Sequence, residues 1–233
     1  MRLLRTGSLV GAAAWVGYGW GAQCALPLLA VWRGPAGRRQ VSLTFDDGPD
    51  PEATPKLLRL LAARGARATF FLIGARAARH PEIVRAIAAE GHEIGNHSWH
   101  HRNAWFLGPR ATEEEIVGGA RVLADIAGKP PTLYRPPWGI VNVAALRAAR
   151  RAGFTTVLWS VQPEGLRACA PEDQLRYCAR RLHDGAIVCL HDAPGLPGAP
   201  DRVLDLMPGL LDLLADRGQA AVAVGDLLSA QPP

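Results

Sequence analysis

From residue 40 onward, short apolar runs alternate with stretches whose apolar residues recur every three or four positions. The short runs predict buried strands, and the periodic stretches predict amphipathic helices. Most of the predicted helices end in a glycine, the residue that most easily adopts the left-handed conformation at a helix terminus. The pattern predicts strands beginning at Val41, Ala68, His92, Thr132, Thr155, Ala186 and Gln219.

Regular alternation of strands and helices indicates a parallel sheet covered by helices. A doubly wound sheet and a closed barrel both satisfy this pattern. However, no phosphate-binding glycine-rich loop follows the first strand, and polar residues suited to chemistry follow several different strands. That distribution is typical of a barrel. We therefore predict an α/β fold of the (β/α)7 barrel type, distorted or incomplete, preceded by an N-terminal apolar helix.

An uncharged segment precedes the alternating region. Residues 6–32 contain no charged side chain, and as a helix they would extend about 40 Å, beyond the roughly 30 Å of bilayer hydrocarbon. A cleaved signal peptide and an uncleaved signal-anchor are both possible, and the missing small-x-small cleavage site favours the anchor. We predict a transmembrane anchor over residues 1–32, a linker over 33–40, a folded domain over 41–228 and a tail over 229–233.

Composition and charge add modest constraints. The hydrophobic fraction of 48% excludes a disordered chain. The net charge of +5 is spread over many arginines, which suits an anionic surface such as a membrane or a cell-wall polymer. No aromatic and basic motif accompanies it, so we predict no nucleic-acid partner.

The chain has four cysteines without a CxxC pair, so they do not indicate a zinc knuckle. Cys169 and Cys178 could form a disulfide if the domain is exported. Two unrelated free thiols fit the sequence equally well, because spacing does not show whether their Cα atoms are close enough.

The strongest chemical signal is a pair of acids at the end of the first predicted strand. Residues 41–45 (VSLTF) form a short, mainly apolar run, Asp46 and Asp47 follow, and Gly48-Pro49 turns the chain. Neighbouring carboxylates repel each other unless their roles differ, and a metal on one leaves the other to accept a proton. Taken alone, the segment also fits solvated turn residues.

Further candidates follow the third, fourth and sixth predicted strands. His97 and His101 are four residues apart, so a helical turn would place both rings on one face, as a divalent metal requires. Arg135 is followed by two prolines that stiffen the chain, and it could orient Asp46. His191 ends the sixth strand, where it could protonate a leaving amine. Each residue alone also fits a structural or surface role.

The segments TFDDGP, HSWHH, RPPWG and CLHD, in this order, make the chain resemble the polysaccharide deacetylase family (carbohydrate esterase family 4) over roughly residues 41–228. The resemblance implies a distorted (β/α)7 barrel and the hydrolysis of an N-acetyl group on an amino sugar, with release of acetate. It also implies that Asp46 is the general base, and that Asp47, His97 and His101 bind a divalent metal, typically zinc.

The resemblance implies three further roles. Arg135 would hold Asp46 in place. The backbone N–H of Trp138 would help stabilise the oxyanion, and His191 would be the general acid that protonates the departing amine. These residue types suit the reaction, because a dipole and a cation stabilise the tetrahedral oxyanion and an acid assists a poor leaving group.

The sequence departs from the family pattern at two places. The family commonly has an Asp-Trp pair after the fifth strand, where the acid tunes the catalytic histidine; here Gly165-Leu166 stand at that position, and Glu164 is our candidate for the missing carboxylate. Cys189 stands where the family usually has a leucine that lines the acetyl pocket. Because cysteine is smaller, this pocket could accept a different acyl group.

We predict a metal-dependent deacetylase that acts on an N-acetylated cell-wall or exported polysaccharide, anchored in the membrane with its catalytic domain outside the cytoplasm. Secretion after signal-peptide cleavage is the alternative location. The alternative functions are a deacylase of a small or lipid-linked amino sugar, and a non-catalytic carbohydrate-binding domain on the same fold. No oligomeric state is predicted.

Overall fold

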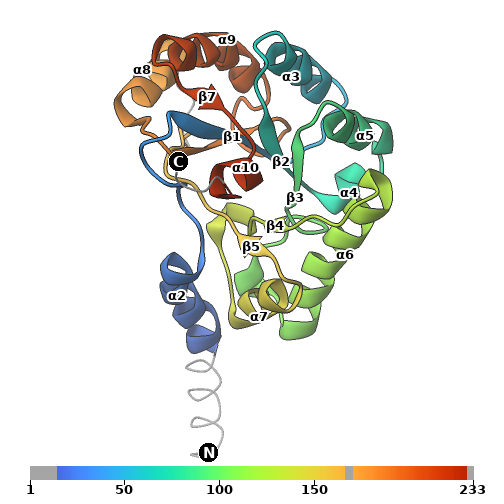
Figure 1. Cartoon of the computed structure of the whole chain (residues 1–233). Coiled ribbons are helices and arrows are strands. Elements are labelled where there is room, and N and C mark those ends of the chain that lie inside the picture. The colour runs from blue at the N-terminus through green and yellow to red at the C-terminus, as the bar shows by residue number, and fades with distance from the viewer. Residues whose placement is uncertain (1–14, 166–169, 230–233) are drawn as a thin grey trace, which may run out of the picture.

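The computed structural model of the chain describes residues 15–165 and 170–229 (Figure 1). Its centre is a curled seven-stranded sheet in which every paired strand is parallel to its neighbour. The strands are β1 (Gln40–Asp46), β2 (Ala68–Leu72), β3 (Glu93–Asn96), β4 (Leu133–Tyr134), β5 (Thr155–Thr156), β6 (Ile187–His191) and β7 (Ala220–Ala221).

The observed strands begin within one residue of their predicted positions. Their spatial order is β5-β4-β3-β2-β1-β6, and β7 pairs with the first two residues of β1. The prediction of a parallel sheet covered by helices is therefore confirmed. The sheet forms a half-barrel, because no continuous ladder joins β5 to β6 within the described residues.

Helices cover the convex side of this sheet (Figure 1). They are α3 (Ala53–Ala62), α4 (Gly74–Ala77), α5 (Pro81–Ala89), α6 (Pro109–Ala127), α7 (Val143–Arg151), α8 (Pro171–Arg181) and α9 (Asp201–Asp216). The six predicted glycine caps all have positive φ: Gly65, Gly91, Gly128, Gly153, Gly185 and Gly218.

The main hydrophobic core lies between the sheet and its helices. Leu57 and Leu61 of α3, Ile87 of α5 and Leu210 of α9 are completely buried there. β2 and β6 are buried along their whole length and read as nearly continuous apolar runs. β1 is also buried along almost its whole length, with Ser42 and Thr44 between its apolar residues. A second cluster fills the inside of the curl, where α10 (Val224–Ser229) packs its buried Val224 and Leu227.

The N-terminal segment packs against the domain at α7. It contains a π-helix, η1 (Gly17–Gly21), followed by α2 (Ala22–Leu29). Ala22 and Leu26 are buried in a cluster with residues 141, 145, 148 and 149. The Gln23 amide donates to the Gly139 carbonyl (2.9 Å), and its oxygen accepts from the Val141 N–H (3.0 Å).

The residues after α2 lie along the open side of the half-barrel. The Val31 N–H donates to the Thr156 carbonyl (2.8 Å), and the Leu158 N–H donates to the Val31 carbonyl (2.8 Å). The Gly34 N–H donates to the Gly185 carbonyl (2.7 Å). This stretch therefore contacts both β5 and the turn before β6, and it lies in the gap between the two ends of the sheet.

The predicted membrane anchor is wrong for the described part of the chain. No helix within residues 15–165 and 170–229 combines the length and the apolar character that a membrane span requires. The helical stretch ends at Leu29, contains Pro27, and turns Ala22 and Leu26 towards the domain. Its uncharged surface therefore serves in part for packing against protein. The alternative of secretion stays a prediction.

Candidate active site

A cleft of about 1110 Å³ lies at the carboxyl ends of the strands. Its lining includes the predicted residues Asp46, Asp47, His97, His101, His191 and Trp138. Asp46 ends β1 and His191 ends β6, and the parallel register pairs these two residues directly. The sheet register therefore places an acid and an imidazole side by side, although they are far apart in the sequence.

Arg135 holds Asp46 inside the protein. Its side chain is completely buried, and its Nη1 donates to Asp46 Oδ1 (2.6 Å) and to Thr44 Oγ1 (2.7 Å). The guanidinium lies 4.0 Å from the centre of the Phe71 ring. Burial raises the pKa of Asp46, but Arg135, His97 and His191 together outweigh this effect and the net pKa is lowered. Asp46 is therefore ionised, and its Oδ2 is left free of the arginine.

Asp47, His97 and His101 converge as a group of metal-ligand atoms. His101 Nε2 lies 3.1 Å and His97 Nε2 lies 3.6 Å from Asp47 Oδ1. This buried oxygen has no hydrogen-bond partner among the described residues, a costly state that a bound cation would relieve. His97 Nδ1 lies 2.7 Å from the Arg135 carbonyl, which fixes the ring with Nε2 towards the site. The residues thus fit a divalent ion.

The two histidines reach the site through an irregular loop rather than through the predicted helical turn. Ser98 and His101 have positive φ values of 67° and 60°. The Asn96 side chain accepts from the Ser98 N–H (3.0 Å), and Ser98 Oγ accepts from the His101 N–H (3.1 Å). Asp47 and Trp138 also have positive φ. Such conformations are uncommon outside glycine and cluster at functional sites.

Burial sets the protonation of two metal-ligand candidates. It lowers the pKa of His101 to about 3, and the neighbouring His97 adds to this effect. The neutral imidazole is the form that binds a metal. Burial also raises the pKa of Asp47, against the opposing influence of His97. A cation at this position would favour the carboxylate form.

Glu164 contacts His191, as its candidate role requires. Glu164 Oε2 lies 3.0 Å from His191 Nδ1, and the Glu164 side chain is completely buried. Burial disfavours the charged imidazole, but the Glu164 hydrogen bond and the nearby Asp46 together raise the pKa of His191 above its ordinary value. His191 is therefore suited to carry a proton at neutral pH.

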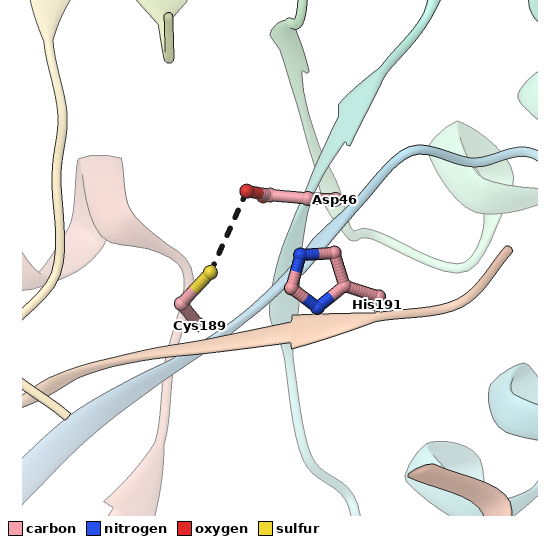
Figure 2. Close-up of side chains that lie close together, drawn as sticks. All are labelled: Asp46, Cys189 and His191. Atoms are coloured by element: carbon pink, nitrogen blue, oxygen red, sulfur yellow. Dashed lines mark hydrogen bonds between the residues drawn. The ribbon is translucent and has the colours of Figure 1, made fainter. Parts of the chain in front are cut away.

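Cys189 and Trp138 lie at different depths of the cleft. The buried Cys189 donates its thiol to Asp46 Oδ2 (3.5 Å), and Figure 2 shows both side chains beside His191. Trp138 is 53% exposed, and its ring centre lies 4.2 Å from that of His101. Cys169, which could form a disulfide with Cys178, lies outside the described residues.

Sequence reasoning missed Arg76, which supports the acidic loop. Its Nη1 donates to the Asp47 carbonyl (2.7 Å), and its Nη2 donates to the Pro194 carbonyl (2.9 Å). It thereby joins the loop after β1 to the loop after β6. An arginine in a helical alanine-rich stretch looks like a solvent-exposed residue, so the sequence carried no signal for this contact.

Asp192, next to His191, is a second residue that sequence reasoning left without a role. It is completely buried, and it accepts a hydrogen bond from Thr54 Oγ1 (2.5 Å). Its carboxyl packs against Gly48, where an added Cβ would come within 2.5 Å of an Asp192 oxygen. Burial raises the pKa of Asp192 to about 7. The CLHD segment was the signal that could have assigned it.

The chain is similar to known proteins over most of its length. The sequence profile of the family described as polysaccharide deacetylase matches residues 33–157. A peptidoglycan-N-acetylglucosamine deacetylase of Bacillus cereus is 37% identical over 202 residues, covering 85% of this chain and 92% of the relative. A chitooligosaccharide deacetylase of a Bradyrhizobium species is 35% identical over 181 residues, covering 76% of this chain and 82% of the relative.

The fold also matches solved structures. The structure of the Bc1960 peptidoglycan N-acetylglucosamine deacetylase aligns with a TM-score of 0.81 at 30% sequence identity. The alignment covers 87% of this chain and 94% of that one. The likeness therefore extends over nearly the whole of both molecules.

Proposed function

Because the chain belongs to the polysaccharide deacetylase family, we propose that it removes N-acetyl groups from amino sugars of a cell-wall or exported polysaccharide in a metal-dependent hydrolysis. The observation that carries this proposal is the convergence of Asp46, His191 and the Asp47–His97–His101 group on one cleft. The relatives named as peptidoglycan and chitooligosaccharide deacetylases support the class of substrate.

In this proposal Asp47, His97 and His101 hold a divalent ion. Zinc suits them best, because two imidazoles and one carboxylate are a common ligand set for catalytic zinc and leave open positions. When bound, such an ion acidifies water and polarises the acetyl carbonyl. The Asp47 oxygen that lacks a hydrogen-bond partner supports this assignment.

Asp46 acts as the general base. Arg135 binds its Oδ1 (2.6 Å) and, together with His97 and His191, lowers its pKa, so Oδ2 can accept the proton of the attacking water. The hydrogen bond from Arg135 also fixes the direction in which Oδ2 points. A base held in position in this way needs little reorganisation before proton transfer.

His191 acts as the general acid on the neighbouring strand β6. Its Nδ1 contacts Glu164, so Nε2 is the nitrogen that can donate a proton to the departing amine. The Trp138 N–H would stabilise the oxyanion of the tetrahedral intermediate. The left-handed backbone of Trp138 (φ 54°) supports a special orientation at this position.

One observation favours a second candidate function. Cys189 lines the cleft beside Asp46, and its side chain is smaller than the leucine common in the family. The chain could therefore remove a different acyl group, or act on a small or lipid-linked amino sugar. The intact base, acid and metal-ligand group argue against a purely carbohydrate-binding role.

The test is acetate release from N-acetylglucosamine oligomers and from peptidoglycan, with added zinc or with a chelator. We expect zinc-dependent release that falls about 10²- to 10⁴-fold in Asp46→Asn, which removes the base. The matched control is Glu113→Gln, an exposed acid on α6. Acetate release by Asp46→Asn at the parent rate would contradict the proposed base, and no release from either substrate by the parent would contradict the proposed activity.

A further inference from the structure

A second group of metal-ligand atoms lies beside the Asp47–His97–His101 group. It consists of the Asp46 carboxylate, the Cys189 thiol and the His191 imidazole, whose ligand atoms all lie within 4.8 Å of one another (Figure 2). All three side chains are buried. We propose that they form a separate site for a thiol-seeking divalent ion, Zn²⁺ or Cd²⁺, and that an ion bound there inhibits the enzyme.

The sheet register creates this arrangement. Cys189 and His191 are two residues apart on β6, so their side chains project from the same face of the strand. Asp46 lies directly opposite His191 on β1. Two neighbouring strands thus present a sulfur, a nitrogen and an oxygen to one point, and no change in the backbone is needed to bring them together.

The spacing between the sulfur and the oxygen fits a tetrahedral ion. Cys189 Sγ and Asp46 Oδ2 are 3.5 Å apart. An ion about 2.3 Å from sulfur and about 2.0 Å from oxygen, with a tetrahedral angle between the bonds, separates these two atoms by about 3.5 Å. The sulfur and the oxygen are thus already at the spacing that a zinc ion imposes.

The remaining atoms of these side chains are already engaged elsewhere. Asp46 Oδ1 accepts from Arg135, which leaves Oδ2 for an ion. His191 Nδ1 contacts Glu164, which leaves Nε2. A carboxylate behind a ligating histidine is a common support in metal sites, because it fixes the ring and strengthens the ligand. Glu164 provides that support here.

The chemistry of the three ligands sets the preference for the ion. When the ion binds, the Cys189 thiol loses its proton to solvent and the thiolate binds the ion. The thiolate and the Asp46 carboxylate together balance the charge of a divalent ion. Thiolate ligands favour zinc and cadmium, whereas magnesium and calcium prefer oxygen ligands. The Asp47–His97–His101 group contains no sulfur, so the two sites differ in this preference.

The consequence for activity rests on the proposed function. An ion at this second site occupies Asp46 Oδ2 and His191 Nε2, the atoms that we assign to the base and the acid. Excess zinc would therefore inhibit an enzyme that needs zinc. A leucine at position 189, as is common in the family, supplies no ligand atom and would remove this inhibition.

The direct test follows metal binding and does not depend on activity. The full chain carrying Cys24→Ser, which removes an exposed thiol, is loaded with one equivalent of zinc and titrated with Cd²⁺. We expect one further equivalent to bind, with the ultraviolet absorbance of a cadmium–thiolate bond. Cys189→Ala in the same background should lose this absorbance, and the control Cys178→Ala should keep it. Equal absorbance in Cys189→Ala would overturn the proposal. It would also be overturned if the Cys24→Ser protein bound no equivalent of Cd²⁺ beyond its zinc.

A second measurement compares the inhibition of each variant with its own uninhibited rate. We expect a tenfold excess of zinc to lower acetate release at least tenfold in the parent, and less than twofold in Cys189→Ala and Cys189→Leu. Magnesium at the same excess should have no effect. Equal inhibition of the parent and both variants would overturn the proposal. If the parent releases no acetate, the proposed function fails, and the cadmium titration still decides the metal site.

Discussion

The two sides of the cleft are positioned by different means. On one side, β1 and β6 pair over five positions, from Ser42↔Ile187 to Asp46↔His191. On the other side, β3 and β4 share one paired position, and β4 and β5 share two. Asp46 and His191 are thus placed by a long backbone ladder, whereas Arg135 and Trp138 follow a strand of two residues.

The side of the cleft formed by β3, β4 and β5, called the short-strand side below, is supported by side chains and by the N-terminal segment. Arg135 donates to the carbonyls of Leu158 (3.1 Å) and Val157 (3.3 Å), and Gln23 bonds to the loop after Trp138. Most of that segment precedes residue 33, where the match to the family profile begins. A short strand can therefore carry a functional residue when contacts outside the sheet replace the missing ladder.

The largest expected effect comes from removing Arg135. Arg135→Met removes the guanidinium that is bonded to the buried Asp46 carboxylate, and we expect the free energy of unfolding to fall by about 3–5 kcal/mol. Acetate release should fall to background, because the base loses both its position and its ionised state. Denaturant unfolding and acetate assays measure the two effects.

Two further variants sharpen this prediction. Arg135→Lys keeps a charge without the forked geometry, so its loss should be smaller than that of Arg135→Met. The double variant Asp46→Asn/Arg135→Met has no unpaired buried charge, and it should be more stable than Arg135→Met alone. If the double variant is less stable than Arg135→Met, the loss of stability does not arise from the unpaired Asp46 carboxylate.

The sequence predicted the sheet well because its strands are bounded by strong local signals. Apolar runs and glycine caps located every strand, including those of only two residues. The N-terminal segment was misinterpreted because a segment without charged side chains can pack against lipid or against protein equally well. Only tertiary contacts, such as the burial of Leu26 against α7, distinguish the two.

The site residues could be predicted where they belong to a recognisable sequence motif. The motifs supplied the convergent residues, and Glu164 followed from a gap in the pattern. Arg76 and Asp192 were missed because they act on backbone or on buried neighbours. The loop through Ser98 and His101 was also missed, since its left-handed residues are not glycines and carry no local signal.

Glu164 tests the link between the two sides, because it follows β5 and contacts His191 on β6. Glu164→Gln removes the carboxylate that helps to raise the pKa of His191, and burial then lowers that pKa. The general acid must be protonated, so the alkaline limb of the pH–rate profile should move to lower pH. At pH 8 we expect the rate to fall roughly tenfold.

The acid limb should move less, because burial and the charge of Arg135 are the two largest influences on the pKa of Asp46. Thermal unfolding at pH 6 controls for a general loss of structure. An alkaline limb at the parent position would exclude Glu164 from this role. A uniform loss of rate at every pH would assign Glu164 to positioning of the histidine ring alone.

The smallest expected effect lies at Gln23, on the short-strand side. Gln23→Ala removes two hydrogen bonds to the loop that carries Trp138, and it should lower the free energy of unfolding by about 1–2 kcal/mol. Because the metal-ligand atoms lie on other loops, we expect a lower kcat and an unchanged zinc affinity, measured by competition with a chelator. Cys24→Ala, on the exposed part of the same helix, is the matched control. A parallel loss of zinc affinity in Gln23→Ala would mean that the two sides of the cleft are not supported independently.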